Sequence, residues 1–143
     1  MAPGFAGLSL GRIVLILLVA VAVGVGVQQL IHRLTAPGPE DLDRTIEGAL
    51  QEIAAGLGPF PRQVDTITRM TGASARGRTL TYRYQVREAP DFEAQRERLR
   101  TMVCDEPSMR GAIARYQVRY TYEYWSEATP PERLAEITVS DCP

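Results

Sequence analysis

The sequence predicts an α+β domain that one N-terminal helix holds to a membrane. An uncharged apolar run covers residues 13–31. Apolar residues recur at helical spacing over 40–55 and 90–104, whereas apolar and polar residues alternate over 79–86 and 116–125, as in half-buried strands. These patterns predict a transmembrane helix followed by two helices on a four-stranded antiparallel sheet, in the order helix, hairpin, helix, hairpin.

The run from Ile13 to Ile31 is predicted to span a bilayer. Arg12 and Arg33 close its two ends, where their side chains can reach the headgroup layers. A helix over this run is about 28 Å long, close to one hydrocarbon thickness. Small residues at 20–22 resemble a signal-peptide cleavage site, but cleavage there would leave too short an apolar core. We therefore expect a retained anchor, with a cleaved signal peptide as the alternative.

Four small residues inside this run are spaced for contact with another helix. Ala20 with Gly24, and Ala22 with Gly26, are each four residues apart. Each pair therefore lies on one helix face and allows a second helix to approach closely. The alternative is that Gly and Ala are simple filler in an apolar run. We keep the four residues as candidate transmembrane packing positions.

The compartment of the domain is predicted mainly from two cysteines, because the charges near the anchor are nearly balanced. Arg12 nearly balances Arg33 and His32, so the positive-inside rule hardly selects an orientation. Cys104 and Cys142 both follow the anchor and would pair in an oxidising compartment. The chain has no Lys or Asn but many Ala, Gly and Arg, which is typical of a GC-rich bacterial genome. We therefore expect a single-pass protein of the bacterial inner membrane, with a cytoplasmic N-terminus and a periplasmic domain.

Breaker residues divide the chain into three parts. Residues 1–35 form the anchor, 36–58 a linker and an amphipathic helix, and 59–143 the α+β domain. Pro and Gly residues on both sides of the helix mark its ends. Acidic residues crowd its first turn, where the helix dipole favours them. One face of this helix, residues 40–55, collects Leu42, Ile46, Ala49, Leu50 and Ile53.

Two hairpins and a helix between them are predicted for the domain. The first hairpin pairs 64–74 with 79–86, the helix covers 90–104 with a further helical turn at 108–114, and the second hairpin pairs 116–125 with 133–140. The tyrosines of these strands, Tyr82, Tyr84, Tyr116, Tyr120, Tyr122 and Tyr124, could form an aromatic binding surface. For Tyr82, Tyr84, Tyr116 and Tyr120 the packing face of the sheet is the favoured interpretation.

Composition and motifs exclude several classes of function. A net charge of −1 argues against nucleic acid as the main partner. His32 is the only histidine, and it lies beside the anchor, so neither a catalytic triad nor a metal site with Cys104 and Cys142 can be assembled. There is no phosphate-binding Gly loop and no nucleophile elbow. We expect no enzyme activity, no cofactor, no metal and no small-molecule substrate.

Three residues on the sheet face opposite the tyrosines are candidates for a partner surface. Trp125 ends its strand on the face opposite the tyrosines, and large aromatic residues often anchor interfaces. Arg83 and Arg119 lie on that same face and could meet an acidic partner or lipid headgroups. The alternative is a solvated sheet face on which these arginines pair across strands with Glu123.

The domain resembles a group of small bacterial periplasmic domains held to the inner membrane by one helix or by a lipid. The group includes the YajI-type lipoproteins and the superinfection-exclusion proteins of lambdoid phages. Four segments carry the resemblance, and together with the residues between them they cover about two thirds of the chain. They are PRQVDTITRMTG (61–72), TLTYRYQV (79–86), MVCDEPSMRGAIARYQVRYTYEYW (102–125) and ITVSDC (137–142). The resemblance implies an α+β domain with a Cys104–Cys142 bridge and no catalytic residues.

The resemblance also implies a role in binding. The phage members of the group bind inner-membrane proteins and block DNA entry. We therefore expect a non-catalytic module whose periplasmic domain contacts another membrane protein, with superinfection exclusion as one version. The alternative is an accessory structural subunit, held in a larger membrane complex through the packing residues of its transmembrane helix.

Overall fold

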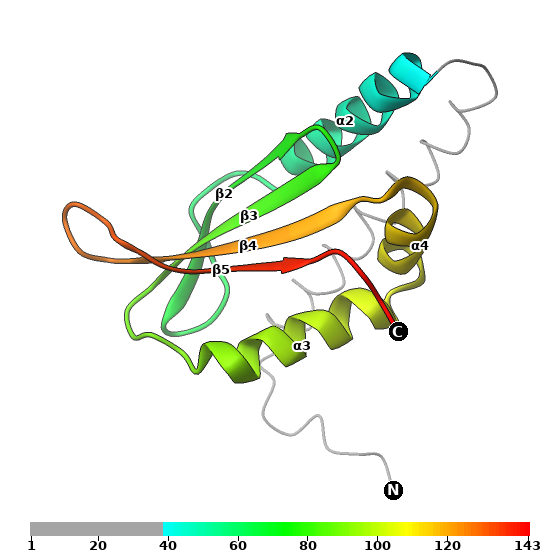
Figure 1. Cartoon of the computed structure of the whole chain (residues 1–143). Coiled ribbons are helices and arrows are strands. Elements are labelled where there is room, and N and C mark those ends of the chain that lie inside the picture. Colours follow the sequence, from blue (N-terminus) through cyan, green and yellow to red (C-terminus); the bar gives the residue numbers. More distant parts are fainter. Residues whose placement is uncertain (1–38) are drawn as a thin grey trace, which may run out of the picture.

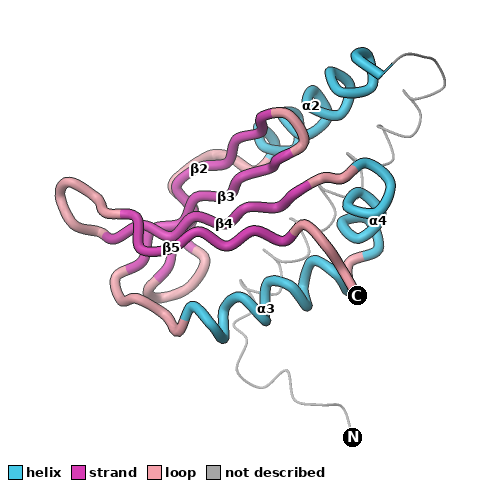
Figure 2. Tube along the Cα trace, in the orientation of Figure 1, coloured by secondary structure: helices cyan, strands magenta, loops and turns pink. Residues whose placement is uncertain are grey.

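Residues 39–143 are described by the structure, a computed structural model, and they form three helices and one sheet (Figures 1 and 2). Helix α2 agrees with the local pattern of its residues, since it has Glu40 and Asp41 in its first turn and buries one apolar face. The elements in order are α2 (Pro39–Gly56), β1 (Arg62–Gln63), β2 (Thr68–Arg76), β3 (Thr79–Val86), α3 (Phe92–Asp105), α4 (Pro107–Tyr116), β4 (Arg119–Ser126) and β5 (Arg133–Val139).

The sheet is mixed, so the predicted antiparallel sheet is wrong in one pairing. Its strand order is β1-β2-β3-β4-β5, and every neighbouring pair is antiparallel except β3 and β4, which are parallel. Helices α3 and α4 connect these two strands and return the chain to the end of the sheet where β3 began (Figure 1). A crossover of this kind brings the next strand in parallel to the last. The class, a small α+β domain, is as predicted.

The strand count also differs from the prediction, because a short strand, β1 (Arg62–Gln63), precedes the segment 64–74, and the first residues of that segment form a turn. The side-chain Oδ1 of Asp65 accepts hydrogen bonds from the backbone N–H groups of Ile67 (2.9 Å) and Thr68 (2.8 Å). This Asp-centred turn separates the short β1 from β2. The sheet of the described region therefore has five strands where four were expected.

Tyr116 ends a helix and does not begin a strand, contrary to the alternating pattern of 116–125. Gln117 has a left-handed backbone (φ 52°) and caps α4, with its N–H donating to the Ile113 carbonyl (3.1 Å). At the other end of α4, Glu106 separates this helix from α3 and caps its N-terminus. Pro107 is the first residue of α4. The expected helical turn at 108–114 is thus a full third helix.

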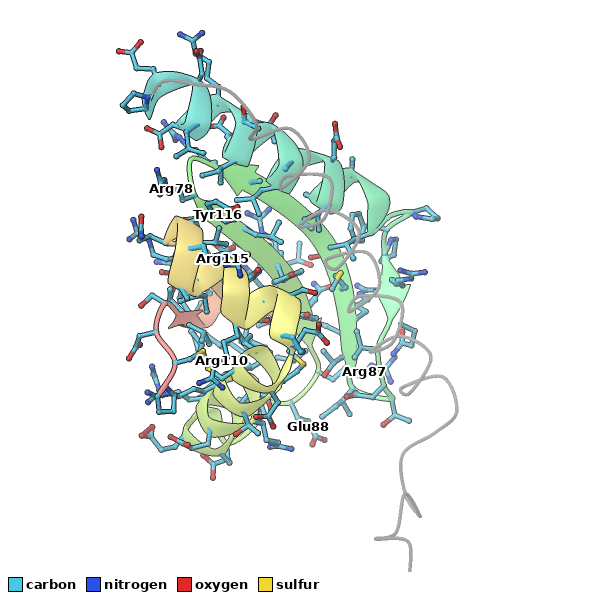
Figure 3. The ribbon with its side chains drawn as sticks, turned by 90° about the vertical axis from the view of Figure 1, so that its right-hand side faces the viewer. Arg78, Arg87, Glu88, Arg110, Arg115 and Tyr116 are labelled. Carbon is cyan, nitrogen blue, oxygen red and sulfur yellow. A yellow bond between two sulfur atoms is a disulfide. The ribbon has the colours of Figure 1, made fainter. Side chains whose placement is uncertain are left out.

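Arg78 links the hairpin turn between β2 and β3 to helices α2 and α4. Its guanidinium donates to Asp43 Oδ1 of α2 (2.6 Å) and to the Tyr116 carbonyl at the end of α4 (2.6 Å). Figure 3 shows Arg78 beside Tyr116. One side chain thereby satisfies an end carbonyl of α4 and fixes the start of α2 against the sheet.

One face of the sheet carries the core. Side chains from α2, α3 and α4 pack with the inward residues of the strands into a single cluster, so the three described helices serve the same face. Tyr82 and Tyr122 stack at its centre with ring centroids 4.9 Å apart, and Tyr84 stacks on Tyr124 at 5.4 Å. The prediction that strand tyrosines build the packing face is confirmed for the buried Tyr82 and Tyr120 and for the half-buried Tyr84, and the buried Tyr122 and Tyr124 lie on the same face.

Alkaline titration is expected to unfold the domain in one step. Burial raises the pKa of Tyr82, Tyr84, Tyr120 and Tyr122 well above 10.0. The unfolded chain, with tyrosine pKa near 10, releases these protons first, so the stability is complete below about pH 10 and falls as pH rises above it. Tyrosinate absorbance and far-UV circular dichroism should change together. If all tyrosines ionised near pH 10 while the fold stayed intact, the burial of these four tyrosines would be contradicted.

The predicted anchor, residues 13–31, and the packing positions Ala20, Ala22, Gly24 and Gly26 lie outside the described residues. Within residues 39–143, every helix falls short of the length and apolarity needed to cross a bilayer.

A disulfide joins Cys104 at the end of α3 to Cys142 beyond β5, across 38 residues of sequence. Two further contacts hold the same tail. Arg100 of α3 pairs with Asp141 (3.5 Å), and Arg110 of α4 donates to the Pro143 carbonyl (2.8 Å). The end of the chain is thereby fixed against both helices of the crossover.

Candidate functional site

The face of the sheet opposite the helices is the candidate functional surface, and we call it the open face. The strand registers place its side chains in four rows that run across the strands. None of the described helices packs on it, and most of its side chains are exposed or half-buried. The rows are Arg76, Thr79 and Arg119; Ser74, Thr81, Thr121 and Thr138; Gly72, Arg83, Glu123 and Glu136; and Arg69, Gln85, Trp125 and Arg133.

Arg83, Glu123 and Trp125 form a cluster on this face. Glu123 Oε2 accepts hydrogen bonds from Arg83 Nε (3.1 Å) and from Trp125 Nε1 (3.1 Å). The Arg83 guanidinium lies over the Trp125 ring, 5.8 Å from its centroid. The Glu123 side chain is 14% exposed and that of Arg83 is 54% exposed. The acid is thus the internal support of the cluster, and the arginine is the part offered to solvent.

The terminal nitrogens of Arg83 are available for a ligand. Arg83 uses Nε for Glu123, and neither Nη group bonds to any described residue. On β2 the residue opposite Arg83 is Gly72, and a Cβ built there would meet open space. The guanidinium is therefore held in position by Glu123 while its outer edge faces an open flank, where it can bind a carboxylate in a bidentate way.

Arg119, the third predicted surface residue, lies apart from this cluster. It pairs in register with Thr79, four residues before Arg83 on β3. The strand rise of about 3.3 Å per residue puts it about 13 Å from Arg83 along the strands. Arg76 lies in the same row on the other side of Thr79. The structure thus brings Arg83 and Trp125 together and gives Arg119 a different neighbour.

A row of hydroxyl groups separates the two arginine positions, and it was not predicted from the sequence. Thr121 and Thr138 share a hydrogen bond between their Oγ1 atoms (2.9 Å), and Thr121 is 7% exposed. Ser74 and Thr81 continue the row on β2 and β3. Each hydroxyl residue is visible in an alternating strand pattern, but only the strand registers align them.

The described region offers neither a metal-binding group nor a free thiol. Residues 39–143 contain no group of three or more His, Cys, Asp or Glu side chains placed to hold a metal ion, and both cysteines are in the disulfide. The open face offers charged and hydrogen-bonding side chains on the strands. This arrangement suits recognition of another molecule by contact.

Comparison with known proteins gives a fold and no family. No protein-family model matches the chain, and no curated protein matches it significantly. It is similar to the crystal structure of a candidate secreted protein from Pseudomonas aeruginosa, with a TM-score of 0.61 and 19% identity over 73% of this chain and 96% of the other. It is also similar to a pilotin of the Vibrio vulnificus type 2 secretion system, EpsS, with a TM-score of 0.59 and 10% identity over 71% and 93%. These two proteins are neither YajI-type lipoproteins nor superinfection-exclusion proteins, so that resemblance remains a prediction. At these identities the likeness shows a shared α+β fold.

Proposed function

We propose that this chain is a non-catalytic interaction protein of the bacterial cell envelope, which binds another membrane protein through the open face of its sheet. In the fuller form of the proposal, residues 13–31 anchor the chain in the inner membrane and the domain lies in the periplasm. Membership of the superinfection-exclusion group, with its binding of inner-membrane proteins, belongs to this fuller form.

The cluster of Arg83, Glu123 and Trp125 is the observation that carries the proposal. Its side chains hold one another in place through two hydrogen bonds and a cation–π contact before any partner arrives. A surface ordered in advance loses less conformational entropy on binding. The fold that the chain shares with a pilotin supports a binding role, and the disulfide supports an oxidising compartment such as the periplasm.

Photo-crosslinking in the native cell tests the proposal. A photoreactive amino acid in place of Thr81, at the centre of the open face, should give one covalent adduct of defined mass. The matched control carries the same group in place of Glu97, an exposed residue of α3. We expect the adduct from Thr81 and none from Glu97, and loss of the adduct when Arg83→Ala and Trp125→Ala are added. Equal labelling from both positions, or no adduct from Thr81, would remove the open face as the binding surface.

An accessory subunit of a larger membrane complex is the second candidate. The spacing of Ala20 with Gly24, and of Ala22 with Gly26, favours it because such pairs allow close helix contact. Exchange of residues 13–31 for an unrelated apolar helix separates the two candidates. A subunit held through its helix should lose its partner in a mild-detergent purification, whereas a protein that binds through the open face should keep it.

A further inference from the structure

We propose that the partner segment recognised by the open face is acidic, with carboxylates that reach both the Arg83 position and the Arg76–Arg119 position. This inference rests on the proposed function, since it names the chemistry of the partner at the same surface.

The strands of the open face carry a positive charge that the whole chain does not have. Among the described residues, five arginines and two glutamates point from these strands to the open face, a formal net charge of +3, whereas the chain as a whole carries −1. They are Arg69, Arg76, Arg83, Arg119 and Arg133, with Glu123 and Glu136. A surface of one dominant sign steers a partner segment of the opposite sign.

Internal pairing leaves specific arginines free to meet that segment. Glu136 is engaged by Arg133 (2.9 Å), and Glu123 by Arg83 through Nε alone. Arg76 and Arg119 are exposed and form no ion pair with another described residue. The acids of the face are thus already occupied, while three guanidinium groups can still receive carboxylates.

The spacing of these groups fits a peptide chain lying along the strands. The distance from the Arg119 row to Arg83 is about 13 Å, or four residues of an extended chain. Thr81 and the other hydroxyls between the two positions can hydrogen-bond polar groups of the same segment. An extended acidic peptide would therefore place one carboxylate at each arginine position and its polar groups over the hydroxyl row.

A lipid surface fits these observations less well. Trp125 would insert into a headgroup layer through a free ring and a free N–H. Here its N–H is bonded to Glu123 and its ring lies beneath the Arg83 guanidinium. Glu123 and Glu136 lie side by side on β4 and the edge strand β5, where they would repel a continuous layer of phosphates. A protein segment can place its own charges around them.

Fluorescence anisotropy of a labelled oligoglutamate peptide tests the inference on the full chain in zwitterionic detergent. The unchanged chain should bind oligoglutamate and not oligoglutamine. Arg83→Gln with Arg119→Gln should weaken binding by about tenfold. The control, Arg44→Gln with Arg96→Gln, removes the same charge from exposed positions on α2 and α3 and should leave the affinity within about twofold. Arg76→Gln with Arg119→Gln, which leaves the Arg83–Trp125 cluster untouched, should also weaken binding.

Three outcomes would overturn the inference. The first is an absence of oligoglutamate binding, and the second is an equal loss in the control variant. The third is binding to phosphatidylglycerol vesicles, but not to phosphatidylcholine vesicles or oligoglutamate, which would assign the face to a membrane surface. The crosslink from Thr81 is independent of all three, so its persistence would keep the proposed function while the acidic partner is withdrawn.

Discussion

Replacing Cys104 and Cys142 together by serine is expected to lower the free energy of unfolding by about 4 kcal/mol. The bridge closes a segment with a sequence separation of 38, and without it the unfolded chain regains the entropy of that open loop. This is a large share of the stability of a domain of this size. Urea unfolding of the oxidised chain and of the double variant measures the difference.

Reduction supplies the control for this prediction. Dithiothreitol should destabilise the unchanged chain to the level of the double variant and should leave the double variant unaffected. A loss below about 1 kcal/mol would mean that the Arg100–Asp141 pair and the Arg110 contact hold the tail without the bridge. Thiol labelling in the native cell is a separate test of the compartment. Reduced cysteines there would contradict the periplasmic placement.

Tyr122→Ala is expected to cost about 3 to 5 kcal/mol. Tyr122 is 2% exposed and stacks on both Tyr82 and Tyr84 on the helix-bearing face. Removal of its ring leaves a cavity among side chains that the sheet holds in place, so the site can collapse only in part. Denaturant unfolding monitored by circular dichroism measures the change.

Trp125→Ala is the matched control, since Trp125 is an aromatic residue of the same strand as Tyr122 but lies on the opposite face of the sheet. The half-buried Trp125 side chain lies on the open face, so its loss should cost about 1 kcal/mol. A larger loss for Trp125→Ala than for Tyr122→Ala would reverse the assignment of core and open face, and the proposed binding surface with it.

Several local features were predictable because they depend on residues close in sequence. The strand 79–86 is found with the predicted bounds, and the helix predicted over 40–55 is α2, Pro39–Gly56. Apolar spacing and helix-ending Gly and Pro residues act over one or two turns, so neighbouring residues suffice to predict them. The side to which Trp125 points also follows from alternation, which is a property of one strand.

The Arg83–Glu123 pair shows where such reasoning stops. The sequence offered this pairing as the alternative to a partner surface, and the structure contains it. Alternation alone could not give the additional bond from Trp125 to the same oxygen, nor the distance between Arg83 and Arg119. Both depend on the register of β3 against β4, which a single strand does not encode.

The sequence by itself determined the helix α2, the strand 79–86, the face on which the tyrosines of that strand pack and the two sulfurs that join. Only the tertiary structure decided that β3 and β4 run parallel, that Tyr116 belongs to a helix and that one acid holds Arg83 and Trp125 together. A strand with one buried face shows the same alternation whichever way its neighbour runs. Its direction is fixed by the packing of the crossover helices, to which residues far apart in the chain contribute.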